Sequence, residues 1–250
     1  MIETNDFKIL QNERNPSVFF IVFFKNSKAL INSITKTKIL LGTTIYDNFT
    51  SFSFKATSVK TFKQYQEYLK MKNGNINMPY NDILKMVYHL TNQLKYVVEN
   101  ENMSFIGYNP ENIIVFDNNK FAYISSEHLF KMNDGFISVT CPFTKTDFFM
   151  SPEILSIKEL PHNICYKSSY YSLGCLIIYS LIPNVNFNNE FNNEFNNEFD
   201  NEFNNEFDNK NKMNNIEKIM DSLSIKGTKL FGLLKRCFLK EPIKRSIIFI

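Results

Sequence analysis

The sequence predicts an α+β protein, with strands dominating the first 57 residues and helices the remainder. Val18 to Phe24 is an unbroken run of β-branched and aromatic residues, as expected for a strand buried on both faces. Between Pro79 and Glu101, apolar residues recur at spacings of four and three, the pattern of an amphipathic helix. Tyr170 to Ile182 is more uniformly apolar but too short to span a bilayer, so we expect a buried core helix there.

Shorter elements are expected between these segments. Lys28 to Leu41 is compatible with a helix, and Thr50 to Lys55 alternates serine and phenylalanine in the manner of a strand. Thr61 to Lys72 predicts a helix of mixed polarity, because Asn73 and Gly74 follow it as a stop signal. Pro79 suits the start of the longest helix, whose apolar stripe consists of Ile83, Val87, Leu90, Leu94 and Val97.

The most informative stretch runs from Tyr108 to Phe116. A polar turn containing Pro110, Glu111 and Asn112 leads into a short β-branched run, and a second polar turn follows at 117–120, so we expect a loop that feeds a β-hairpin. This stretch resembles the catalytic loop of eukaryotic protein kinases, His-Arg-Asp-Leu-x-Pro-Glu-Asn. Of that motif, this sequence keeps the final Pro-Glu-Asn.

Later segments resemble further motifs of the same family in the expected order. Ser151, Pro152 and Glu153 follow an aromatic residue and a methionine, and they are similar to the Ala-Pro-Glu motif. The segment 237–245 looks like the family's Asp-Pro-x-x-Arg. The resemblance implies that Arg245 forms a buried, structural ion pair with Glu153.

The segment 169–174 resembles the family's Asp-x-Trp-Ser-Leu-Gly. Ser172 and Gly174 match that pattern, whereas Ser169 replaces the Asp whose carboxylate braces the catalytic loop in kinases. Together these matches imply a two-lobed protein-kinase-like fold. A reduced, β-rich N-lobe would cover residues 1–57, and a mainly helical C-lobe would cover residues 58–250.

The groups that carry out phosphoryl transfer in this family are missing. Gly107 stands at the position of the catalytic base, and Ser125 at that of the magnesium-binding Asp of Asp-Phe-Gly. No G-x-G occurs anywhere in the chain. Lys25 is the one candidate for the strand lysine, and its helix partner is absent because 14–46 contains no acidic residue. Asn112 and Lys25 are thus the remaining candidates for nucleotide contact, although a lone lysine closing a strand is commonly just solvated.

The resemblance therefore predicts a catalytically inactive kinase-like module that binds or scaffolds a protein partner and needs no cofactor or metal. One alternative is an atypical serine/threonine kinase that uses ATP and magnesium through another acid. A second alternative is a degenerate paralogue, or a chance match, without a binding role. The acids available for the first alternative are Glu111, Glu127, Asp134 and Asp147.

Composition narrows the other possibilities. A net charge of +3 with scattered lysines gives no reason to expect a nucleic-acid partner. The four cysteines lack C-x-x-C spacing and the three histidines are not placed at metal-ligand intervals, so we expect reduced, mostly buried thiols. Without a signal-peptide pattern or an apolar span, the expected location is the cytoplasm and no membrane partner is expected.

A low-complexity insert covers Phe187 to Lys210, built on Asn-Asn-Glu-Phe. Phenylalanine recurs every four residues, which drifts around a helix of 3.6 residues per turn and does not form one apolar stripe. Asparagine is a poor helix former, so we expect disorder or a frayed helix, with a self-associating or partner-binding tract as the alternative. Thr140, Thr144 and Thr146 in the preceding segment are possible phosphorylation targets.

Overall fold

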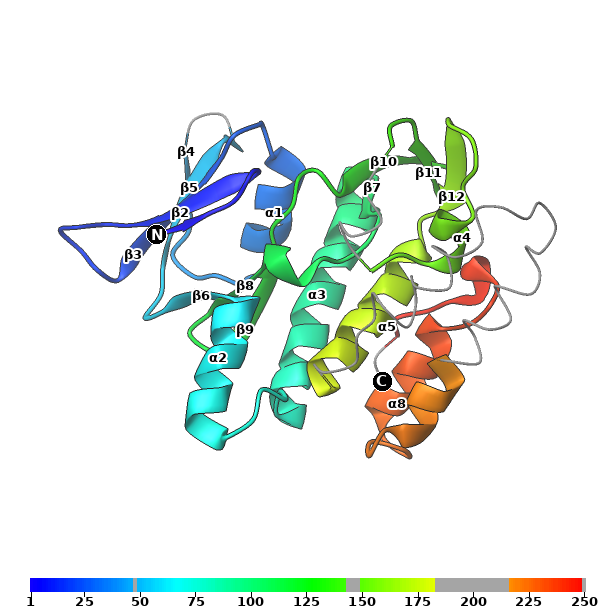
Figure 1. The fold of residues 1–250 in the computed structure, drawn as a ribbon. Coiled ribbons are helices and arrows are strands. Elements are labelled where there is room, and N and C mark those ends of the chain that lie inside the picture. The colour runs from blue at the N-terminus through cyan, green and yellow to red at the C-terminus, as the bar shows by residue number, and fades with distance from the viewer. Residues whose placement is uncertain (47–48, 143–148, 183–215, 249–250) are drawn as a thin grey trace.

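The computed structural model describes residues 1–46, 49–142, 149–182 and 216–248. It has the α+β composition expected from the sequence, and the sheets are antiparallel. A five-stranded sheet formed by the N-terminal segment lies at one end of the molecule (Figure 1). Helix α3 runs through the middle of the molecule. The repeat at 187–210 lies outside the described residues, as do Thr144, Thr146 and Asp147.

The N-terminal sheet has the strand order β1-β2-β3-β5-β4. Its strands are β1 (Ile2–Glu3), β2 (Phe7–Gln11), β3 (Val18–Phe23), β4 (Thr44–Tyr46) and β5 (Ser51–Lys55). The expected strand at 50–55 is confirmed. The expectation that the β3 run is buried on both faces is wrong, because Phe19, Ile21 and Phe23 are buried while the alternate side chains stay partly exposed. One face of the sheet carries the core and the other is only half covered.

Three helices follow the predicted pattern. Helix α1 (Lys28–Lys36) ends earlier than the expected Leu41. Helix α2 (Phe62–Asn73) begins with a capping box between Thr61 and Gln64, and it ends at Gly74, whose φ of 78° suits a residue without a side chain. Helix α3 (Tyr80–Glu101) carries all five residues of the predicted apolar stripe in the core.

The predicted hairpin after the polar loop is present. Strands β8 (Ile113–Phe116) and β9 (Lys120–Tyr123) pair in antiparallel fashion, and β6 (Val59–Thr61) completes a three-stranded sheet. Asp117 and Asn118 in the turn adopt positive φ angles, which short polar side chains tolerate. The 3-10 turn η2 (Pro110–Asn112) precedes the hairpin.

A four-stranded sheet, ordered β12-β11-β10-β7, contains a hairpin that the sequence analysis missed. Asp134 and Gly135 form its two-residue turn with φ angles of 48° and 80°, and Asp-Gly is a strong hairpin signal. The strands are β7 (Met103–Phe105), β10 (Leu129–Asn133), β11 (Phe136–Val139) and β12 (His162–Cys165).

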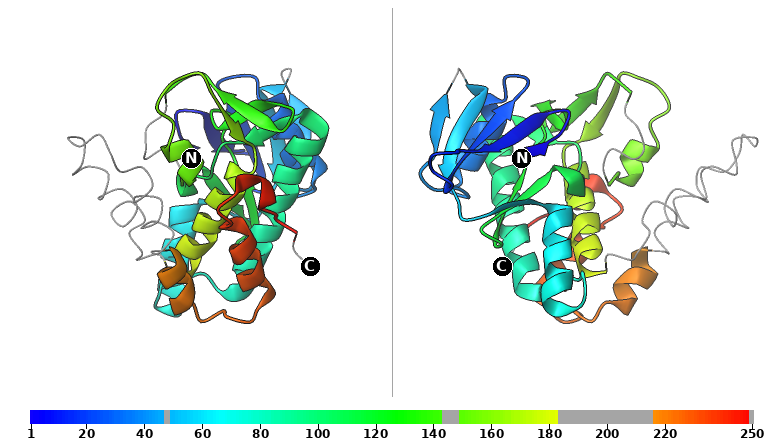
Figure 2. Two further views of the ribbon diagram at one scale, coloured as in Figure 1. Left: turned by 90° about the vertical axis from the view of Figure 1, so that its right-hand side faces the viewer. Right: turned by 60° about the vertical axis from the view of Figure 1, so that its left-hand side comes forward.

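The expected buried helix is α5 (Ser168–Leu181), which contacts both α3 and α8 (Lys229–Cys237) (Figure 2). The short helix α4 (Pro152–Leu155) precedes it, and the 3-10 turn η3 (Pro242–Lys244) follows α8. One hydrophobic cluster includes residues from both sides of position 57, and Phe54 packs edge-on against Phe116 with ring centroids 5.1 Å apart. The two parts of the chain therefore share a core, and the lobe boundary at 57 stays a prediction.

All four cysteines are free thiols, but the expectation of mostly buried thiols is only half right. Cys175 and Cys237 are buried, whereas Cys141 is exposed and Cys165 partly exposed. Among the described residues, none of the helices combines the length and the apolar character needed to cross a membrane.

His89 lies on α3 at the margin of the core. Its ring centroid is 6.4 Å from that of Phe121, and its Nδ1 atom is buried without a hydrogen-bond partner among the described residues. Burial, together with the nearby charges of Lys120 and Lys85, lowers the pKa of His89 to about 4. The folded protein therefore favours the neutral imidazole of His89.

This shift predicts a pH-dependent loss of stability. In the unfolded chain His89 takes up a proton near pH 6.5, whereas the folded chain resists it until about pH 4. Stability due to the neutral ring is complete above pH 6.5 and is lost as the pH falls toward 4, at a cost of about 2 kcal/mol. Urea unfolding of wild type and His89→Gln at pH 7 and pH 4.5 measures how much unfolding free energy each protein loses on acidification. The variant should lose less stability on acidification, and equal losses would contradict this origin.

Candidate functional site

The loop that resembles the kinase catalytic loop is rigidly held. Gly107 is buried, and the side chain of Asn109 accepts a hydrogen bond from the Glu111 amide at 2.9 Å, which caps the η2 turn. The carbonyl of Asn112 accepts a bond from the Ile124 amide at 2.8 Å. These contacts fix the Pro110–Asn112 turn against the strand that leads to Ser125.

A serine of α5 braces this loop from below. The Ser172 hydroxyl accepts a hydrogen bond from the buried Tyr108 amide at 2.7 Å. Ser169, at the position of the family's bracing Asp, instead donates to the Tyr166 carbonyl at 2.9 Å. The loop brace that seemed lost with the Asp is therefore supplied three residues later, by a hydroxyl on the same helix.

The hydroxyl of Tyr123 stands at the centre of the site. It accepts a hydrogen bond from the Asn109 amide at 3.2 Å and lies 2.5 Å from His128 Nδ1. The side chains of Asn112 and Ser125 lie beside it and act to lower its pKa. Burial raises the pKa of Tyr123 and these groups only partly offset the effect, so the phenol is neutral.

Helix α3 fixes the backbone of Tyr123 through a buried glutamine. Gln93 donates to the Tyr123 carbonyl at 2.8 Å and accepts from its amide at 3.0 Å. The same Gln93 amide nitrogen lies 3.1 Å from the Ser33 hydroxyl of α1. One fully buried side chain thus connects α1, α3 and β9 at the site.

A carboxylate reaches the site from the N-terminal sheet. Asp6, in the turn between β1 and β2, is 7% exposed. Its carboxylate accepts hydrogen bonds from the Ser126 amide, at 2.5 Å, and from the Ser126 hydroxyl. Ser125 next to it is buried. The segment that would bind magnesium in the family is therefore tied to the N-terminal sheet by Asp6.

These residues do not fit a magnesium ion. Magnesium prefers carboxylates and phosphate oxygens in octahedral geometry, and Asn112 and Ser125 offer only neutral groups. Asp6 is the nearby carboxylate, and each of its oxygens accepts a hydrogen bond from Ser126. Within the described residues, no group of three or more histidines, cysteines or acids is placed to hold a metal ion.

The other functional residues predicted from the sequence are not among the polar groups that contact Tyr123 and Ser126. Lys25 is exposed just beyond β3, consistent with a solvated charge at a strand end. Glu111 and Glu127 are exposed, and Asp134 is exposed in the turn between β10 and β11. Thr140 is also exposed.

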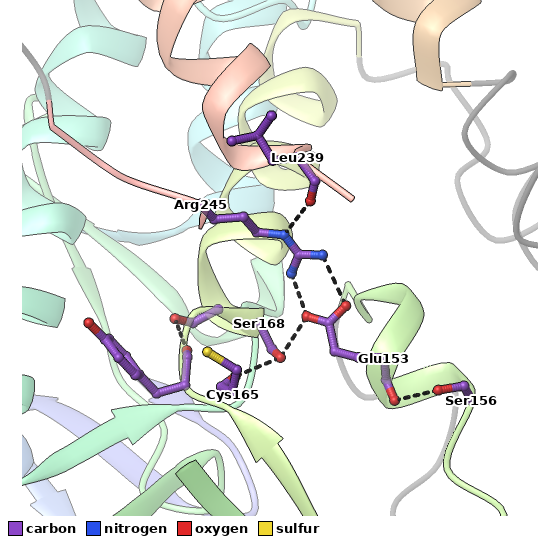
Figure 3. Close-up of polar contacts among 8 residues, drawn as sticks. Glu153, Ser156, Cys165, Ser168, Leu239 and Arg245 are labelled. Atoms are coloured by element: carbon purple, nitrogen blue, oxygen red, sulfur yellow. Dashed lines mark hydrogen bonds and ion pairs between the residues drawn. The ribbon is translucent and has the colours of Figure 1, made fainter. Parts of the chain in front are cut away.

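A second polar site, the ion pair between Arg245 and Glu153, confirms the expectation from the resemblance (Figure 3). Arg245 Nη1 pairs with Glu153 Oε1, and Nη2 donates to Oε2 at 3.0 Å. Arg245 is 1% exposed, and its Nε donates to the Leu239 carbonyl at 2.9 Å. Ser168 donates to Glu153 Oε1 at 2.7 Å. The two-point contact and the added bonds compensate for desolvation of both charges.

Aromatic rings and a glycine surround this ion pair. The Arg245 guanidinium lies 5.2 Å from the ring centroid of Tyr171, and Phe238 packs edge-on against the same ring at 5.1 Å. A Cβ added at Gly174 would lie 2.8 Å from the Phe238 ring. Gly174 therefore permits the close contact of α5 with the end of α8.

Asp6 and Tyr123 are the residues of the site that sequence reasoning missed. Asp6 lies 120 positions before its partner Ser126, and no local pattern links the two. Tyr123 reads as an ordinary strand residue. The one available signal was its position two residues before Ser125, at the end of a strand that leads into the position of the family's metal-binding Asp.

Comparison with known proteins adds no family assignment. No protein-family model matches the chain, and a search of curated proteins finds no match.

We expect Arg245→Met to destabilise the protein by about 3–5 kcal/mol, because it leaves the Glu153 carboxylate without its cation in a largely dry site. Urea unfolding followed by circular dichroism measures the loss. The matched control is Lys244→Met, which breaks an exposed pair with Glu241 one position away and should cost less than about 1 kcal/mol. Equal losses in the two variants would rule out a special role for the buried pair.

Two serines of α5 provide a matched test of the loop brace. Ser172→Ala leaves the buried Tyr108 amide without its acceptor and should cost about 1–3 kcal/mol. Ser169→Ala should cost less, because the Tyr166 carbonyl still accepts a bond from the Ser169 amide. Both changes are buried serine-to-alanine substitutions in one helix. If Ser169→Ala proves the more damaging in urea unfolding, Ser172 is not the brace.

Proposed function

We propose that this protein is a catalytically inactive, protein-kinase-like module that acts by binding a protein partner. The observation that carries the proposal is the position of the Tyr123 hydroxyl, which lies beside the side chains of both Asn112 and Ser125. In the family, the residues at these two positions hold magnesium against the nucleotide phosphates. Here both side chains are neutral and lie beside a neutral phenol, so the carboxylate that binds magnesium in the family has no counterpart at Ser125.

The N-terminal segment supports the same conclusion. Kinases carry the phosphate-binding lysine on the third strand and its glutamate partner on the helix that follows. Here the third strand, β3, is also followed by a helix, α1, but α1 contains no acidic residue and Lys25 is exposed beyond the strand. Phosphoryl transfer depends on positioned charges, and the charges are missing on both sides of the site.

The groups that remain are those that hold the chain together. The Arg245–Glu153 pair, the Ser172 brace and the Pro110–Asn112 turn all make well-formed contacts. A chain that keeps these contacts while it lacks the catalytic carboxylates is suited to presenting surfaces to a partner.

The test is thermal unfolding with and without millimolar ATP, in magnesium and then in EDTA, beside an active kinase domain as positive control. A ligand at 100 times its dissociation constant adds about 2.7 kcal/mol, which shifts the midpoint by roughly 5–10 °C for a domain of this size. We expect no shift for this protein and no transfer of labelled phosphate to a general protein substrate. A magnesium-dependent shift accompanied by transfer would overturn the proposal in favour of an atypical kinase.

A further inference from the structure

A cavity of about 190 Å³ lies beside the Arg245–Glu153 pair. Tyr171, Phe238, Leu239 and Pro242 supply its apolar walls, and Leu239 is 40% exposed, so the cavity reaches the surface. An apolar cavity of about 150 Å³ is large enough to hold a benzene ring. This one therefore has room for the ring of a phenylalanine.

The rim of this cavity is basic. Lys240 lines it, is exposed, and pairs with no acid among the described residues. The segment 229–248, which supplies five of the lining residues, contains six basic residues and a single acid, Glu241, which Lys244 neutralises. Arg245 and Glu153 neutralise each other within the cavity wall. An acidic ligand with an aromatic side chain matches this combination of charge and shape.

The chain itself contains a peptide of that chemistry. The repeat Phe187–Lys210 has six phenylalanines four residues apart, and seven acidic residues against the single Lys210. Each phenylalanine thus has an acid close to it in sequence. The apolar ring suits the cavity, and the acids suit Lys240 and the basic segment around it.

The numbers of rings and cavities favour binding between molecules. The repeat has six phenylalanines, whereas the described part of the chain has one such cavity beside the ion pair. That cavity can hold one ring of its own repeat at most, so the other rings are free to bind other copies. Repeated weak contacts on one tract also raise the effective concentration of a bound partner.

We propose that the cavity lined by Tyr171, Phe238 and Leu239 binds a phenylalanine from the acidic repeat of a second copy of this chain. The protein then associates with itself, with Lys240 attracting the acids that flank the bound ring. This inference goes beyond the proposed function and does not depend on the loss of phosphoryl transfer.

The experiment is sedimentation velocity of the full chain over a range of concentrations. The tract variant replaces the six repeat phenylalanines by serine. Ser156→Tyr fills the cavity from an exposed position on its rim, and Lys240→Glu reverses the exposed charge. The matched control is Lys131→Glu, an exposed lysine on β10 in the four-stranded sheet. Thermal unfolding by circular dichroism checks that each variant folds.

We expect wild type and Lys131→Glu to self-associate, and the tract variant and both cavity variants to weaken the association at least tenfold. A mixture of the tract variant, which keeps the cavity, with Ser156→Tyr, which keeps the phenylalanines, should form a complex again. Raised salt should weaken association of the wild type. A monomeric wild type, association that persists in either cavity variant, or a mixture that stays monomeric would overturn the proposal.

Discussion

The buried ion pair between Arg245 and Glu153 is the contact on which the C-terminal half of the structure depends. It joins α4 to a residue 92 positions later, next to η3. A buried pair is a poor source of net stability, because desolvation offsets much of the attraction. Its effect is positional, since both charges are satisfied only when α4, the start of α5 and the segment after α8 meet in one arrangement. Ser168, the Leu239 carbonyl and the Tyr171 ring complete that arrangement.

The region that resembles a kinase active centre is organised by neutral hydrogen bonds and one carboxylate. Tyr123 collects the polar groups of the loop, and Gln93 fixes the tyrosine backbone to α3. Asp6 joins the N-terminal sheet to Ser126. The same physical demand applies throughout, because buried polar groups must find partners. Tyr123, Gln93 and Asp6 find partners within the chain, whereas the buried Tyr108 hydroxyl has none among the described residues.

The cavity proposed to bind a phenylalanine lies at the surface, beside the Arg245–Glu153 pair. The cavity lined by Tyr171 and Phe238 lies where the ion pair joins the segment after α8 to α4, and where Gly174 allows Phe238 to approach α5. The contact that stabilises the fold therefore also builds the proposed docking site.

The sequence by itself determined the local elements. The capping box at Thr61, the stop at Gly74 and the stripe on α3 are specified within a few residues, so α2 and α3 were predictable. The family resemblance also pointed correctly to the Arg245–Glu153 pair. Tertiary structure alone decided that one face of β3 is half exposed, that Asp6 binds Ser126, and that Ser172 replaces the missing brace. Each of these three features depends on which distant parts of the chain come into contact, and only the packing of the whole chain decides that. A local sequence pattern specifies which element a segment forms, but it does not specify which other element that segment packs against.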